Sequence, residues 1–132
     1  MNQTLALIKP DAVERNIIGK IISLIETDGF IIKDMKLIKM SRSIAEEFYS
    51  CHKDKSFFEK LINYMTSGET VALILERENA VENYRLLIGA TDPQIAEEGT
   101  IRKQYAIDKS YNSVHGSDSN ENAKREISII FG

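Results

Sequence analysis

Hydrophobic positions along this chain follow two periods, and together they predict alternating strands and helices. Short apolar runs that are nearly continuous or loosely alternating are typical of strands. They predict strands over residues 3–8, 30–40, 70–76 and 112–116. Apolar residues that recur every three or four positions are typical of amphipathic helices. They predict helices over residues 14–27, 43–52, 57–65, 79–87 and 118–131.

Several of these elements carry end signals in the sequence. Gly89 closes the fourth predicted helix, and Asp118 with Glu121 forms the pattern of a capping box at the start of the last one. Residues 90–113 lie between them and show no hydrophobic period. An irregular segment of this length inside a small domain is usually functional or disordered.

The order of the predicted elements favours an α+β fold. With the extra short helices set aside, it fits βαββαβ, the ferredoxin-like arrangement of a four-stranded antiparallel sheet with helices on one face. An open α/β sheet of the flavodoxin type is the alternative. The chain has 132 residues, of which 42% are hydrophobic. That is enough for one domain with its own core over residues 1–132, and too little for two.

Composition narrows the possible partners and the compartment. The formal net charge is −3 with both signs mixed along the chain, which argues against a duplex nucleic-acid binder. No apolar run approaches a membrane span, and the N-terminus lacks the layout of a signal peptide. Cys51 is the single cysteine, so no internal disulfide forms, and we expect a packed thiol in a cytoplasmic protein.

The segment NSVHGSDS, residues 112–119, is the strongest candidate for chemistry. Small residues surround His115 and allow a ligand to approach its ring closely. A nucleophilic histidine also needs a partner for its second ring nitrogen. Glu126 shares a helix face with core-type residues, where a carboxylate is costly unless it is paired. Its partner could be His115, directly or through Ser117; the alternative is that Glu126 lies in solvent at the edge of that face.

Other candidates are scattered along the sequence. Lys9, Arg85 and Arg102 could neutralise phosphate charge, although each such cation is more often a solvated surface group. Spacing alone cannot bring them together. Phe57 could stack on a base or belong to the core with Phe58.

Two further polar residues flank these candidates. The polar loop around His52 suggests a surface residue. Asp118 is either a helix cap or a water-mediated contact to a metal carried by a ligand.

The segment NSVHGSDS, followed by AKREI, resembles the active-site segment of nucleoside diphosphate kinases. Four further blocks resemble the same family in the same order, and the resemblance covers about residues 4–131. These blocks are LALIKPDAVERNIIGKII, FFEKLINYMTSG, NAVENYRLLIGATDP and GTIRKQYA.

The resemblance implies a ferredoxin-like enzyme that moves the terminal phosphate of a nucleoside triphosphate, mainly ATP, to a nucleoside diphosphate. The route is ping-pong through a phosphohistidine at His115, which Glu126 and Ser117 hold. The resemblance implies a stacking role for Phe57 and contacts to phosphates and ribose from Lys9, Tyr49, Arg85, Thr91, Arg102 and Asn112.

The same resemblance implies a cofactor and an assembly. Mg²⁺ enters with the nucleotide and not in a protein cage, with Asp118 as a contact through water. The family forms homo-oligomers, with a hexamer favoured here over a tetramer or dimer, and it needs neither nucleic acid nor membrane.

Departures from the family pattern lie away from His115. Ser56, Glu69 and Glu98 stand where prolines are common, which leaves the unfolded chain looser. Lys109 stands where an apolar residue often covers the base, so base affinity can differ.

Two other functions fit part of the pattern. A phosphocarrier would pass phosphate from His115 to a protein and would need no base-stacking ring. A ferredoxin-like binding module would bind nucleotide or single-stranded nucleic acid without chemistry.

Overall fold

The computed structural model describes residues 2–132 as strands and helices in regular alternation. The strands are β1 (Gln3–Ile8), β2 (Ile31–Ile38), β3 (Thr70–Glu76) and β4 (Val114–Gly116). The helices are α1 (Pro10–Glu14), α2 (Ile18–Thr27), α3 (Arg42–Phe48), α4 (Phe58–Met65), α5 (Ala80–Ile88), α6 (Ile101–Tyr105) and α7 (Asn120–Phe131), with a 3₁₀ turn, η1, over Ser50–His52.

The four strands form one sheet in the order β2-β3-β1-β4. Every neighbouring pair is antiparallel, with Leu5 opposite Ile74 and Leu7 opposite His115. This order and these directions confirm the predicted ferredoxin-like sheet. They exclude the flavodoxin alternative, because that sheet is built from parallel strands.

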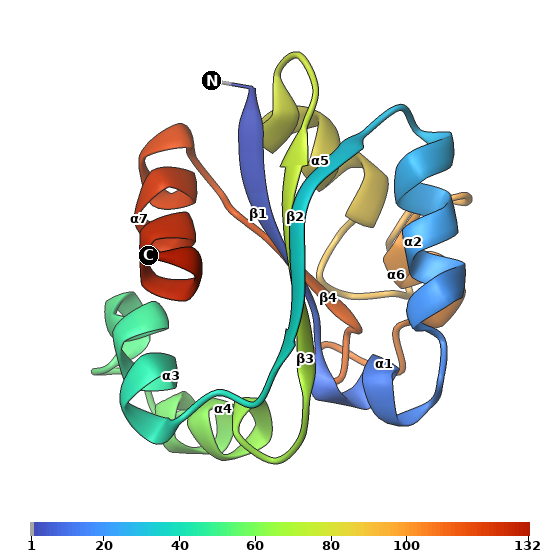
Figure 1. Cartoon of the computed structure of the whole chain (residues 1–132). Coiled ribbons are helices and arrows are strands. Elements are labelled where there is room, and N and C mark those ends of the chain that lie inside the picture. The colour runs from blue at the N-terminus through green and yellow to red at the C-terminus, as the bar shows by residue number, and fades with distance from the viewer. Residues whose placement is uncertain (1) are drawn as a thin grey trace.

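Helices cover both faces of this sheet (Figure 1), so the prediction of helices on one face is wrong. One core cluster holds Ile8 and Leu73 under α1, α2, α5 and α6. The other holds Leu7 and Ala72 under α3, α4 and α7. The nearly continuous apolar sequences of β1 and β3 indicate helices on both faces, because a strand that is buried on both faces has apolar residues at successive positions.

Two short helices were not predicted. The first is α1, which precedes the helix predicted over residues 14–27. That helix begins only at Ile18, as α2, because Asn16 between the two takes a left-handed conformation with φ of 61°. Asparagine tolerates that conformation better than most residues. The second, α6, lies inside the segment predicted as irregular, and Thr100 caps it by accepting a hydrogen bond from the Lys103 N–H.

The last helix begins one residue later than the predicted capping box. Ser119, not Asp118, is the N-cap, and its hydroxyl accepts a hydrogen bond from the Asn122 N–H. Asp118 instead accepts a hydrogen bond from the Asn122 side chain at 2.6 Å. The predicted N-cap, Asp118, is therefore one residue too early, and its carboxylate lies outside the helix.

Strand β2 forms one edge of the sheet and carries exposed apolar side chains. Ile31, Met35 and Leu37 are 59%, 50% and 54% exposed. Within residues 2–132, none of the helices is long and apolar enough to cross a membrane.

Candidate active site

His115 occupies the middle of β4, where pleating points its ring toward the face covered by α3 and α7. The ring of Phe48 packs edge-on against the imidazole, with centroids 5.1 Å apart. The ring of Tyr49 approaches it from 6.4 Å. These two aromatic contacts restrict how the imidazole can rotate.

A buried carboxylate fixes the protonation pattern of that imidazole. Oε1 of Glu126 lies 2.9 Å from Nε2 of His115 and also accepts a hydrogen bond from the Ser117 hydroxyl at 2.7 Å. A carboxylate can only accept, so Nε2 carries the proton and Nδ1 keeps its lone pair. Nδ1 has no hydrogen-bond partner among residues 2–132. Of the two alternatives for Glu126, the paired one is correct.

His115 lines a pocket of about 560 Å³. Six other predicted site residues share the lining with it, although they come from distant parts of the chain. They are Lys9, Tyr49, Phe57, Thr91, Arg102 and Asn112. Arg102 lies in α6, and the others lie in loops or directly beside β1, α3 and α4. The fold thus supplies the convergence that spacing could not establish.

Two cations near His115, the buried Lys9 and the half-buried Arg102, contribute positive charge to this pocket. The Lys9 ammonium donates to Oδ1 of Asn112 at 2.9 Å, and burial, followed by the nearby Arg102, lowers its pKa to about 8. Arg102 donates to the carbonyls of Gly89 and Val114 at 3.1 and 2.9 Å. Burial also lowers the pKa of its guanidinium, and its Nε has no partner among the described residues. Two cations held in a low-dielectric site bind an anion strongly.

The outer end of the pocket is aromatic. Phe57 is 46% exposed, whereas Phe58 packs against the core, so only one of the two phenylalanines is a core residue. The His52 ring lies 5.4 Å from the Phe57 ring, between centroids, and lines the pocket. His52 is partly exposed, as predicted, but its contact with Phe57 was not predicted. The hydroxyl of Tyr49 is buried without a partner in the described part of the chain.

A sequence profile described as "Nucleoside diphosphate kinase" matches residues 2–132. The chain belongs to the nucleoside diphosphate kinase family. It is 56% identical over 131 residues to a nucleoside diphosphate kinase of Histophilus somni strain 129Pt, covering 99% of this chain and 93% of the relative. It is 57% identical to one of Lawsonia intracellularis, covering 99% and 95%.

Solved structures of nucleoside diphosphate kinases share the fold. The enzyme of Aquifex aeolicus superposes with a TM-score of 0.97 at 40% identity, over 99% of this chain and 95% of the other. The enzyme of Halobacterium salinarum, solved in complex with CDP, gives 0.94 at 38% identity over 99% and 88%. The phosphotransferase class expected from the sequence is confirmed by this membership.

Four predicted residues of this nucleoside diphosphate kinase site lie outside the pocket lining. Ser117 and Glu126 are buried and hydrogen-bonded to each other. The other two are charged surface residues. Arg85 is exposed on α5. Asp118 is exposed just before α7, and the hydrogen bond from Asn122, followed by the charge of Arg85, lowers the pKa of its carboxyl. The side chains of Arg85 and Asp118 therefore lie near the site but do not line the pocket.

Sequence reasoning missed part of the pocket and one surface feature. Lys60, Tyr64 and Tyr111 line the pocket of this nucleoside diphosphate kinase. Tyr64 was predicted only as part of the helix over residues 57–65, and no local signal marks the other two. Cys51 is exposed, so the expectation of a packed thiol is wrong.

Proposed function

We propose that this chain transfers the terminal phosphoryl group of a nucleoside triphosphate, mainly ATP, to a nucleoside diphosphate through Nδ1 of His115. The observation that carries the proposal is the 2.9 Å contact of Nε2 with Glu126. It leaves Nδ1 as the nucleophile in a pocket that also contains Lys9 and Arg102.

The transfer takes two steps of the same kind. In the first, the Nδ1 lone pair forms a bond to the γ-phosphorus, and the bond from that phosphorus to the β–γ bridging oxygen breaks. The nucleoside diphosphate leaves with the bonding electrons. In the second, a terminal β-phosphate oxygen of another nucleoside diphosphate attacks the phosphorus, and the N–P bond breaks. Glu126 accepts a hydrogen bond from Nε2 throughout and stabilises the positive charge on the ring.

Phosphoryl transfer depends mainly on positioning and on neutralising charge. Lys9 and Arg102 supply two cations. The Tyr49 hydroxyl, which has no partner among residues 2–132, supplies a buried donor to a phosphate oxygen. Asn112 orients Lys9, and Thr91 contributes a hydroxyl at the rim. Arg85 adds positive charge from outside the pocket wall. Ser117 orients Glu126 through its 2.7 Å hydrogen bond.

Magnesium fits this site as a part of the nucleotide substrate. Among residues 2–132, no three His, Cys, Asp or Glu side chains gather as metal ligands would. Asp118 keeps an ionised, exposed carboxylate beside the site and suits a contact through water. Mg²⁺ bound to the phosphates would neutralise part of their charge, and Asp118 would orient its water shell.

The base stacks on Phe57, supported from behind by His52. Stacking reads no hydrogen-bonding edge, so several bases and both ribose and deoxyribose are acceptable. Lys109 in the pocket lining replaces the apolar cover usual in the family.

The test is the intact mass of the protein after mixing with ATP and Mg²⁺, with His115→Ala in parallel. We expect one acid-labile phosphoryl adduct on the wild type, none on the variant, and loss of the adduct when GDP is added. An adduct that GDP does not discharge would contradict the proposal and indicate a phosphocarrier. Bound nucleotide without any adduct would indicate a binding module.

We also propose a homo-oligomer, with a hexamer favoured over a tetramer or dimer. Exposed Ile31, Met35 and Leu37 on the edge strand β2 support it, because monomers usually protect such edges. Light scattering of Met35→Lys should give a smaller particle than the wild type. A wild type that is already monomeric would contradict the proposal.

A cytoplasmic location and a single domain complete the proposal. The one cysteine, Cys51, is an exposed free thiol, which suits a reducing compartment. The family profile runs over residues 2–132, which supports a single domain.

A further inference from the structure

A strained serine lies between two parts of the proposed phosphate site. Ser113 has a left-handed backbone with φ of 74°, although it is not a glycine, and it is fully buried. Such a conformation persists in a non-glycine residue only where the surroundings hold it. Ser113 does not line the nucleotide pocket, so its side chain has no direct use there.

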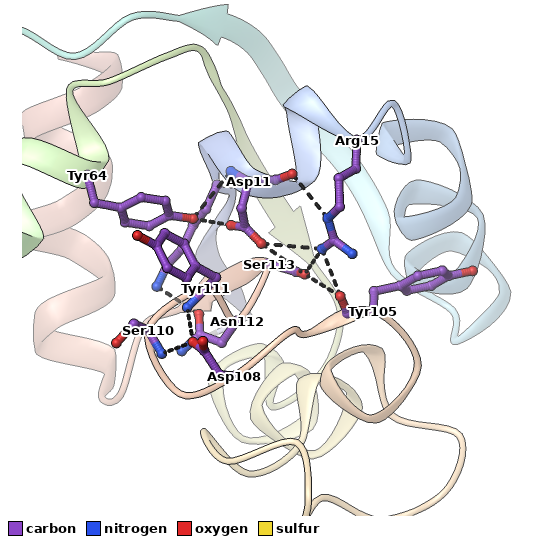
Figure 2. A network of polar contacts seen from close by, with 10 residues as sticks. Asp11, Arg15, Tyr64, Tyr105, Asp108, Ser110, Tyr111, Asn112 and Ser113 are labelled. Carbon is purple, nitrogen blue, oxygen red and sulfur yellow. Dashed lines mark hydrogen bonds and ion pairs between the residues drawn. The ribbon is translucent and has the colours of Figure 1, made fainter.

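Polar groups from two helices hold the Ser113 hydroxyl (Figure 2). It accepts a hydrogen bond from Nη2 of Arg15 at 2.8 Å and donates to the Tyr105 carbonyl at 3.1 Å, with Oδ2 of Asp11 3.4 Å away. Arg15 also donates to the Tyr105 carbonyl at 2.7 Å and pairs with Asp11 at 3.3 Å. We call Asp11, Arg15 and Ser113 the serine clamp.

The clamp also reaches the pocket wall through an aromatic pair. The Tyr64 hydroxyl donates to Oδ1 of Asp11, and the Tyr64 ring packs edge-on against Tyr111 with centroids 5.1 Å apart. Both tyrosines line the nucleotide pocket. Both also line a second hollow of about 610 Å³, together with Asp11 and Arg15. The clamp thus borders the pocket from behind.

Residues on both sides of Ser113 hold the two cations. Its carbonyl accepts a hydrogen bond from the Lys9 N–H at 2.8 Å, and the preceding Asn112 accepts one from the Lys9 ammonium at 2.9 Å. The carbonyl of the following Val114 accepts from Arg102 at 2.9 Å. The direction of both carbonyls and of the Asn112 side chain depends on the backbone angles at Ser113.

We propose that the serine clamp positions Lys9 and Arg102 for phosphoryl transfer by holding the left-handed turn at Ser113. Asp11, Arg15 and Ser113 are positioning residues, because they act on the groups that hold the cations and do not line the nucleotide pocket. Their one contact with a lining residue is that of Asp11 with Tyr64. The inference rests on the proposed function, because it concerns the same pocket.

Single-turnover phosphorylation of the full chain by ATP and Mg²⁺ tests the clamp, with the rate at saturation and the apparent KM recorded separately. Ser113→Ala and Arg15→Met should each lower the saturated rate about tenfold, since a misplacement near 1 Å is enough for such a loss. The KM should change less, because Phe57 and its stacking are untouched. The double variant should be no slower than Ser113→Ala, because the two residues act as one unit.

Ser113→Gly separates the hydroxyl from the backbone strain. Glycine adopts positive φ freely but cannot be clamped, so we expect its rate to be as low as that of Ser113→Ala. Arg77→Met is the matched control, since Arg77 donates to the Asp28 carbonyl at 2.7 Å and pairs with its carboxylate far from the pocket. Its rate should equal that of the wild type.

Three results would overturn the inference while the wild type still forms its adduct. The first is a rate within twofold of the wild type for Ser113→Ala and Arg15→Met. The second is a wild-type rate for Ser113→Gly, which would show that the backbone conformation is sufficient without the hydroxyl. The third is an equal loss in Arg77→Met. Should Ser113→Ala not fold, Arg15→Met still tests the clamp from its more exposed end. A wild type without an adduct would instead remove the proposed function.

Discussion

At the scale of single residues, the site depends on one carboxylate that serves two donors. Oε1 of Glu126 accepts from both His115 and Ser117. Glu126→Gln keeps the shape and removes the charge that stabilises the ring during transfer. We expect phosphorylation of His115 to slow by roughly 10- to 100-fold, as when a ligating histidine loses the partner that orients its ring. Rapid-quench kinetics would measure it, and an unchanged rate would mean that Glu126 is only structural.

Lys9 predicts a pH dependence of the same reaction. Its pKa of about 8 lies below the ordinary 10.5, so the free enzyme loses this cation as the pH rises through 8. We expect kcat/KM for ATP to fall above that pH, while kcat falls at higher pH because bound phosphate holds the proton on Lys9. Lys9→Arg keeps its charge and should lose this alkaline decline. A decline at the same pH in Lys9→Arg would assign it to another group.

The same shift affects stability with a definite sign. The unfolded chain binds more protons at Lys9 than the folded chain between pH 8 and 10.5. The free energy of unfolding due to this group therefore rises with pH across that window. Burial of Lys9 costs stability at neutral pH, which is reasonable for a group whose role is to bind phosphate.

At the scale of elements, the turn after α5 anchors Arg102. Gly89 has φ of 84°, and a Cβ there would lie 2.6 Å from the Thr100 hydroxyl oxygen. Its carbonyl accepts from Arg102. Gly89→Ala should therefore lower the free energy of unfolding by about 1–3 kcal/mol from the strained backbone alone, with the clash in addition, and should raise the KM for ATP.

Gly99→Ala is the matched control for that change. Gly99 has a similar φ of 86°, but a Cβ there meets nothing within 4 Å. Urea denaturation of both variants would compare them. Equal losses would show that the contact with Thr100 contributes nothing.

Strand β4 shows a second close approach between elements. A Cβ on Gly116 would lie 2.7 Å from Cδ2 of Tyr84, a buried residue of α5. The glycine next to His115 thus lets α5 pack on the back of β4. The small residues of NSVHGSDS therefore serve packing behind the ring as well as ligand access in front of it.

At the scale of the whole molecule, β1 and β3 send side chains into both cores and couple them. Leu73 lies in the cluster under α2 and α5, and Met65 in the cluster under α3 and α7. Replacing either by alanine should lower the free energy of unfolding by about 2–5 kcal/mol. Unfolding should remain one transition, because both cores pack on the same strands and neither core can unfold without exposing the other.

Leu86→Ala is the control for both substitutions, since Leu86 is 69% exposed and should change stability little. Circular dichroism and tyrosine fluorescence would follow the transitions in denaturant. Two separate transitions would show that the faces unfold independently.

The sequence by itself determined the order of the main elements and the candidates for the site, and it favoured the antiparallel sheet over a parallel one. Hydrophobic periods locate β1, β3, α2 and α7 because burial on one stripe or on both faces leaves a local pattern. The segment around His115 indicated its chemistry, since small neighbours and a glutamate on a core face are visible without coordinates. The short helix α6 was also within reach, because Thr100 is a typical N-cap.

Only the tertiary structure decided which candidates meet and what each one does there. Lys9, Phe57, Arg102 and His115 come from distant parts of the chain, and no local pattern encodes their distance. The same holds for His52, which lines the pocket, for Arg85, which does not, and for the exposed Cys51. These outcomes depend on how helices pack on both faces of the sheet, which is set by contacts between residues far apart in sequence.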